Sequence, residues 1–181
     1  MKKMKKMLAA IVAGFVLFIG TASAVTPEDI FLNYGGGIQK GDSVATISVA
    51  LPWDMLSKGS GHLPVFLGEY EYALPVGPVP FTFGGYAGIT GWWHDSYGAA
   101  VLNLGGSAKY HIAVPPVPGL DFFIGTKLGL GITIGHIPDG ARYVGFDWGL
   151  DVGVSYFFND TVGITGALGY PSGRIGVAFK F

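Results

Sequence analysis

Residues Phe146–Phe158 read FDWGLDVGVSYFF, and this stretch decides the fold class. Its large apolar residues fall at every second position, with Asp, Gly and Ser between them. A period of two indicates a β-strand with two unlike faces, whereas an amphipathic helix repeats every 3.6 residues. Phe122–His136 alternates in the same way, with Thr126 as its exception. The chain is therefore predicted to be all-β.

Six further segments alternate with the same period: Ile30–Gln39, Val65–Leu74, Phe81–Trp92, Val101–Ile112, Thr161–Tyr170 and Arg174–Phe181. Together with the first two they predict eight strands. Val44–Leu51 alternates as well, but counting it would give an odd number, and single-chain bacterial barrels have even numbers of strands. We interpret Val44–Leu51 as a bulged extension of the first strand or as a ribbon in an outer loop. The sequence does not decide between these two, nor whether the segment is instead a barrel strand of its own.

The two faces of these strands indicate a barrel that lies in a membrane, not a water-soluble protein. One face carries large apolar residues along about ten positions, the length of a transmembrane β-strand. The other is mostly Gly, Ala, Ser and Thr, which suits the crowded interior of a narrow barrel. A soluble sandwich or lipocalin-like barrel would place many charges in water, yet only 13% of the residues are charged and 31 are Gly. We therefore predict an eight-stranded antiparallel up-and-down transmembrane β-barrel.

The connections fit a chain that crosses a bilayer repeatedly, with short periplasmic turns and longer outer loops. We place Pro75–Pro80, Val114–Leu120 and Asn159–Asp160 on the periplasmic side, and Lys40–Leu63, Trp93–Gly98, Ile137–Tyr143 and Pro171–Gly173 on the outer side. Aromatic girdles are expected at both interfaces with lipid. The predicted girdle is Tyr72, Phe81, Tyr110, Phe122, Phe158 and Phe181 at the periplasmic end and Trp92, Trp148 and Tyr170 at the outer end.

The first 24 residues have the pattern of a secretory signal peptide. Four lysines precede an apolar run from Leu8 to Gly20, and Ala22-Ser23-Ala24 follows as a cleavage site. The apolar run is too short to cross a bilayer as a helix, which needs about 20 residues. We predict export by the Sec pathway, cleavage after Ala24, and a barrel domain spanning 25–181 in the outer membrane. The domain would be acidic, because cleavage removes only basic charges.

Little in the sequence indicates catalysis, and we predict that the protein is not an enzyme and holds no cofactor. His94-Asp95-Ser96 resembles the His-x-Ser of lipid A deacylases, but the Glu that orients the histidine in that family has no counterpart downstream. His62, His94, His111 and His136 lack metal-ligand spacing, so no metal is assigned. A net charge of −1 offers no basic surface for nucleic acid. Trp53-Asp54-Met55-Leu56 is interpreted as a short exposed helix, a membrane-interface anchor or a contact for a partner.

Strand parity assigns nine polar side chains to the lumen: Glu69, Glu71, Lys109, His111, Lys127, Asp147, Asp151, Arg174 and Lys180. Eight of them are four acids and four bases. Charges in a low-dielectric interior must be paired, so one interpretation is a salt-bridge network that closes the lumen. The other is a gated polar path for small solutes. A wide pore is excluded, because aqueous channels need about 16 strands.

The signal peptide, the eight segments and the closing run Ile175, Val177, Phe179 and Phe181 together resemble small outer-membrane barrels. The closing run looks like the signal read by the barrel assembly machinery. Glu69–Pro75, followed by Pro80–Gly85, is similar to the OmpW-like family and its spirochaete-type relatives. That resemblance implies a narrow, porin-like channel or binding barrel for small solutes, hydrophobic ones included. The competing function is a surface adhesion or structural barrel with a plugged lumen, which acts on a host or surface ligand through loop 40–63.

Overall fold

The computed structural model describes residues 37–53, 60–74, 81–113 and 117–181. These residues form nine strands: β1 (Ser43–Pro52), β2 (Ser60–His62), β3 (Val65–Leu74), β4 (Phe81–His94), β5 (Tyr97–Ala113), β6 (Leu120–His136), β7 (Val144–Phe157), β8 (Val162–Tyr170) and β9 (Ser172–Lys180). No helix among the described residues is long and apolar enough to cross a membrane.

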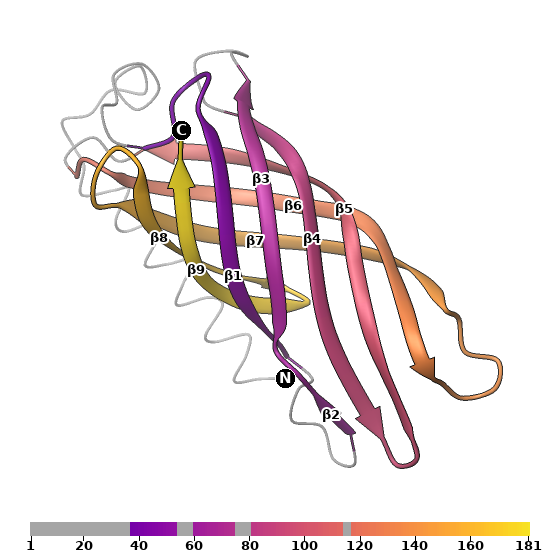
Figure 1. Ribbon diagram of the computed structural model, residues 1–181. Coiled ribbons are helices and arrows are strands. Elements are labelled where there is room, and N and C mark those ends of the chain that lie inside the picture. The colour runs from indigo at the N-terminus through magenta and orange to yellow at the C-terminus, as the bar shows by residue number, and fades with distance from the viewer. Residues whose placement is uncertain (1–36, 54–59, 75–80, 114–116) are drawn as a thin grey trace, which may run out of the picture.

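Eight of the strands close into a barrel (Figure 1). From β3 to β9 each strand pairs antiparallel with the next one along the chain. β1 closes the ring, since it pairs with β3 on one side and with β9 on the other. The short β2 stands outside the ring of eight and pairs with the end of β4. The predicted eight-stranded antiparallel up-and-down barrel is confirmed.

The identity of the first strand was predicted wrongly. Val44–Leu51 is neither an extension nor a loop ribbon, because it forms most of β1 and is hydrogen-bonded to strands on both sides. Of the predicted strand Ile30–Gln39, residues 30–36 lie outside the described residues, and residues 37–39 are not in a strand. Lys40–Leu63 is consequently not one long loop, since β1 lies inside it. The predicted number of eight wall strands is still correct, because Val44–Leu51 forms a wall strand in place of Ile30–Gln39.

Ile47 tests this assignment of β1. It lies in the middle of the strand with 68% of its surface exposed on the outside of the barrel. Because a lysine near the middle of a lipid-facing strand costs about 2–4 kcal/mol, Ile47→Lys should lower the free energy of unfolding in vesicles by that amount. Leu63→Lys, in the connection between β2 and β3, should cost less than about 1 kcal/mol. Equal effects in urea titrations would contradict the placement of β1 in the wall.

Each of the eight wall strands presents large apolar side chains outward. Examples, one from each strand in chain order, are Ile47, Phe66, Phe83, Leu104, Leu128, Phe146, Ile164 and Ile175. Water-soluble monomers rarely expose continuous apolar surface on this scale, whereas a transmembrane barrel carries an apolar band around its outside. The inner face follows the opposite parity and holds the buried polar residues.

The two ends of the barrel differ. Ser43 and Phe181 lie at one end, the terminal end, where their backbones exchange two hydrogen bonds. At the opposite end, the far end, β8 and β9 turn back at Pro171, while β4 to β7 continue beyond this hairpin (Figure 1). The pairing of β7 with β8 starts at Leu150, so residues 144–149 pair only with β6 among the described strands. The rim at the far end is therefore uneven.

Aromatic residues lie near both ends of the outer surface. At the far end, Trp148 and Tyr170 are exposed, with ring centroids 4.9 Å apart. Of the neighbouring residues Trp92 and Trp93, Trp93 is the one exposed on the outer surface. The sequence predicted Trp92 for the aromatic girdle, but Trp92 is half-buried. In the closing strand, Ile175 and Val177 face outward.

Candidate functional site: the lumen of the barrel

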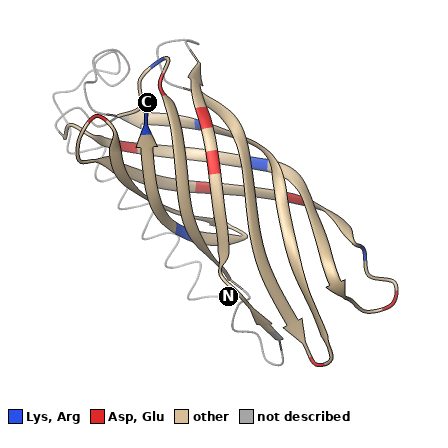
Figure 2. Cartoon of the chain, viewed as in Figure 1, with Lys and Arg blue, Asp and Glu red and all other residues tan. Residues whose placement is uncertain are grey.

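Six charged side chains meet in the middle of the lumen, and we call them the central cluster: Glu69, Glu71, Lys109, Lys127, Asp151 and Arg174. The parity of five different strands brings them together, namely β3, β5, β6, β7 and β9. Figure 2 shows these positions on the strands, and it also shows that β4 carries no charged residue along its length. All six belong to the set that the sequence assigned to the lumen.

Glu69 is the centre of the central cluster. Its Oε2 accepts a hydrogen bond of 2.7 Å from Arg174 Nη1 and lies 3.6 Å from Lys109 Nζ. Its Oε1 lies 3.2 Å from Lys127 Nζ, in an ion pair without an aligned hydrogen bond. The Glu69 side chain is 1% exposed, so this carboxylate depends on its three cationic partners instead of water.

The other two acids complete the pairing. Glu71 accepts hydrogen bonds from Lys109 Nζ at 3.0 Å and from Ser107 Oγ at 3.2 Å. Asp151 Oδ2 lies 2.9 Å from Arg174 Nη2 and 3.9 Å from Lys127 Nζ. Three carboxylates therefore face three cations across the lumen. Charges taken out of water need this kind of mutual compensation, and the cluster provides it in the middle of the barrel.

Three of the nine predicted lumen residues lie apart from the central cluster. Lys180 is near the terminal end, where its Nζ donates to the Gly37 carbonyl oxygen at 3.0 Å and lies 3.7 Å from Asp42. Asp147 is toward the far end and accepts a hydrogen bond from Tyr86. His111 is fully buried on the terminal side of the cluster. The predicted balance of four acids and four bases is thus not one network.

His111 joins Thr82 and Asp121 in a buried chain of hydrogen bonds. His111 Nδ1 lies 2.7 Å from Asp121 Oδ2, and His111 Nε2 lies 3.0 Å from Thr82 Oγ1. A carboxylate, an imidazole and a hydroxyl in this order can activate a nucleophile. Here all three side chains are buried, so a substrate has no access to the hydroxyl in this structure. Asp121 was not assigned to the lumen from the sequence, because the predicted strand began at Phe122.

Two aromatic side chains cross the lumen, and neither was assigned there from the sequence. Phe123 is 3% exposed and lies beside three cationic or imidazole groups: Lys109 Nζ at 5.1 Å, the Arg174 guanidinium at 5.9 Å and the His111 ring at 6.0 Å. Gly153, opposite Phe123 in the register, leaves room for its ring. Tyr86 reaches past Gly129 and donates a hydrogen bond of 2.6 Å to Asp147 Oδ2.

An apolar cluster also lies inside the terminal end of the lumen. Ile38 packs in a buried cluster with Val44, Ala73, Phe157 and Ala178. Lys180 Nζ lies 5.2 Å above the Phe157 ring, so its ammonium group sits over this cluster. Ile38, which precedes β1, therefore packs inside the terminal end of the barrel.

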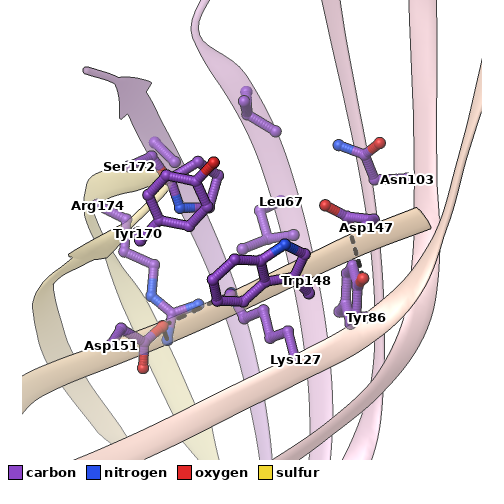
Figure 3. Close-up of a pocket in the computed structure, with 14 residues that line it drawn as sticks. Leu67, Tyr86, Asn103, Lys127, Asp147, Trp148, Asp151, Tyr170, Ser172 and Arg174 are labelled. Carbon is purple, nitrogen blue, oxygen red and sulfur yellow. Dashed lines mark hydrogen bonds and ion pairs between the residues drawn. The ribbon is translucent and has the colours of Figure 1, made fainter. Parts of the chain in front are cut away.

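A small cavity of about 70 Å³ opens between the central cluster and the far end. Charged and polar groups from the inner wall line it together with aromatic residues at the β8–β9 hairpin. In Figure 3, Asp147 and Tyr86 lie on one side, and Asp151 with Arg174 on the other. At roughly 10–15 Å³ for each water molecule, the cavity has room for a handful of waters or one small solute.

The other candidates from the sequence lie outside the lumen. His94 Nε2 is 3.4 Å from Asp95 Oδ2, and both side chains are largely exposed in the β4–β5 turn. No group of three or more metal-binding side chains is found in the described residues. Trp53 Nε1 donates a hydrogen bond of 2.5 Å to the Gly169 carbonyl oxygen, and the ring packs near Gly173. Trp53 therefore covers the outside of the β8–β9 hairpin.

The comparisons with known proteins support the fold. The sequence matches no family model and no curated protein. The structure is similar to a solved structure described as "De novo design of transmembrane beta-barrels", with a TM-score of 0.53 and 15% sequence identity. The match covers 80% of this chain and 98% of the designed one. The fold is therefore that of a transmembrane β-barrel, which suggests a membrane location.

Proposed function

We propose that the protein is an outer-membrane barrel that binds small solutes in its far-end cavity and does not conduct them through the lumen. The central cluster carries this proposal, because its paired charges fill the middle of the lumen while the cavity beside it stays open. Eight-stranded barrels are just wide enough for side chains to fill the interior. Phe123 and the apolar cluster around Ile38 close the path further toward the terminal end.

The proposed location is supported by features of the sequence and by the fold. A signal peptide cleaved after Ala24 would direct the chain to the Sec pathway. The alternating run that ends at Phe181 would be read by the barrel assembly machinery. In this arrangement the terminal end faces the periplasm and the far-end cavity faces outward, as the longer connections there favour. The resemblance of Glu69–Pro75 to the OmpW-like family also supports small-solute binding.

Cysteine labelling tests this proposal cleanly, because the natural sequence contains no Cys. Asn103→Cys places a thiol at the cavity, and Ser155→Cys places one in the buried lumen on the terminal side of Asp151. We expect a small methanethiosulfonate reagent to label the first variant readily and the second only slowly. The refolded chain should also be silent in a planar bilayer. Equal labelling of both thiols, together with discrete conductance steps, would instead establish a through-going channel.

A further inference from the structure

Asp147 differs from Asp151, the other acid that lines the cavity, in having no cationic partner among the described residues. Its Oδ2 accepts the hydrogen bond from Tyr86 at 2.6 Å, a length typical of a hydroxyl donating to a charged carboxylate. Tyr86 is neutral, so this bond orients the carboxylate without cancelling its charge. Within the described part of the chain, no Lys or Arg makes an ion pair with Asp147. Its Oδ1 makes no hydrogen bond there either.

The cations nearest the cavity are already committed to other acids. Arg174 bonds to Glu69 and to Asp151, and Lys127 is ion-paired with the same two carboxylates. The central cluster is balanced without Asp147, so the far half of the lumen carries one excess negative charge. A half-buried carboxylate in a narrow barrel is poorly solvated, and an uncompensated charge of this kind favours a counter-ion.

We propose that the far-end cavity binds a small organic ammonium ion, with its charged nitrogen against Asp147 Oδ1. This inference rests on the proposed binding function and names its ligand class. Asn103 lines the same side of the cavity and offers an amide oxygen as a second acceptor (Figure 3). Trp148 and Tyr170 border the cavity at the far end, but their rings lie against each other on the outer surface, so the ammonium group is held by the oxygen acceptors.

The competing ligand classes fit less well. An anion would meet Asp147 without a free cation to receive it. A drug-sized ligand needs a pocket of about 300–1,000 Å³, which is far larger than the cavity of about 70 Å³. A neutral solute fits by size but leaves the charge of Asp147 uncompensated.

Three probes of matched size test the charge preference: n-propylammonium, propan-1-ol and acetate. Each is titrated against the refolded chain in phosphatidylcholine nanodiscs, with binding followed by ligand-detected NMR. We expect propylammonium to bind at least about tenfold more tightly than the other two. Asp147→Asn should remove most of this preference, because it keeps an acceptor for Tyr86 and deletes the charge. Asp139→Asn, an exposed acid between β6 and β7, is the matched control and should change nothing.

The outcomes separate the two proposals. If propanol binds as well as propylammonium, or Asp147→Asn leaves ammonium binding unchanged, the ligand class is wrong while the binding function stands. If acetate is preferred, the charge argument is overturned. If none of the probes binds, both proposals fail. Should Asp147→Asn not fold, as judged by heat-dependent gel mobility, the three probes on the natural chain still decide the matter.

Discussion

Glu69→Gln is expected to lower the free energy of unfolding by about 3–5 kcal/mol, since removing one member of a buried charge network leaves its partners uncompensated. The substitution keeps the shape of the side chain and deletes the charge that Arg174, Lys109 and Lys127 share. Two acids would then face three cations in the middle of the lumen. Urea titration of the chain folded into vesicles, followed by tryptophan fluorescence, measures the loss.

Two further variants make this result interpretable. Asp160→Asn removes an exposed acid from the β7–β8 turn and should change stability by less than about 0.5 kcal/mol. Glu69→Gln combined with Lys127→Gln restores equal numbers of acids and bases in the cluster, so part of the lost stability should return. A near-neutral Glu69→Gln would mean that water solvates the cluster, and the lumen would then not be closed there.

Phe123→Ala is expected to cost about 3–5 kcal/mol, the usual range for truncating a buried Phe. The substitution leaves a cavity inside a rigid wall and removes the aromatic face beside Lys109 and Arg174. Phe146→Ala is the comparison, because this 71% exposed side chain faces outward and leaves no internal cavity. Its cost should be clearly smaller in the same unfolding measurement.

A substitution at Gly153 tests whether the Phe123 ring fills the space inside the barrel beside this glycine. A Cβ at Gly153 would overlap the Phe123 ring and would come within 2.6 Å of the Gly166 carbonyl oxygen. Gly153→Ala should therefore destabilise the natural chain more than it destabilises the Phe123→Ala variant, where only the backbone contact remains. Additive effects in this double-mutant cycle would show that the ring does not depend on the space that Gly153 leaves.

Alternation in the sequence predicts the class, the number of strands and the face on which each charge lies. It does not predict which of two alternating segments enters the wall, because Ile30–Gln39 and Val44–Leu51 have similar patterns. That choice depends on hydrogen bonds to β9, which is distant in sequence, as well as on those to β3.

The content of the lumen is only partly predictable for a related reason. A search for polar residues finds the central cluster, but Tyr86 and Phe123 resemble girdle or lipid-facing aromatics when read singly. Their parity, shared with Thr82 and Lys127 on the same strands, is the signal that places them inside. The sequence does not show which charged side chains form ion pairs with each other. Only the structure therefore shows that Asp147 and Lys180 lie apart from the central cluster.

The uneven far-end rim has a consequence for the surrounding lipid. Because the β8–β9 hairpin ends at Pro171 while β7 continues to Val144, the apolar band is shorter on one side than on the other. A bilayer adapts to a short apolar wall by thinning beside it, at a fraction of a kcal/mol per ångström of mismatch. The bilayer should therefore be thinner beside the β8–β9 hairpin than around the rest of the barrel.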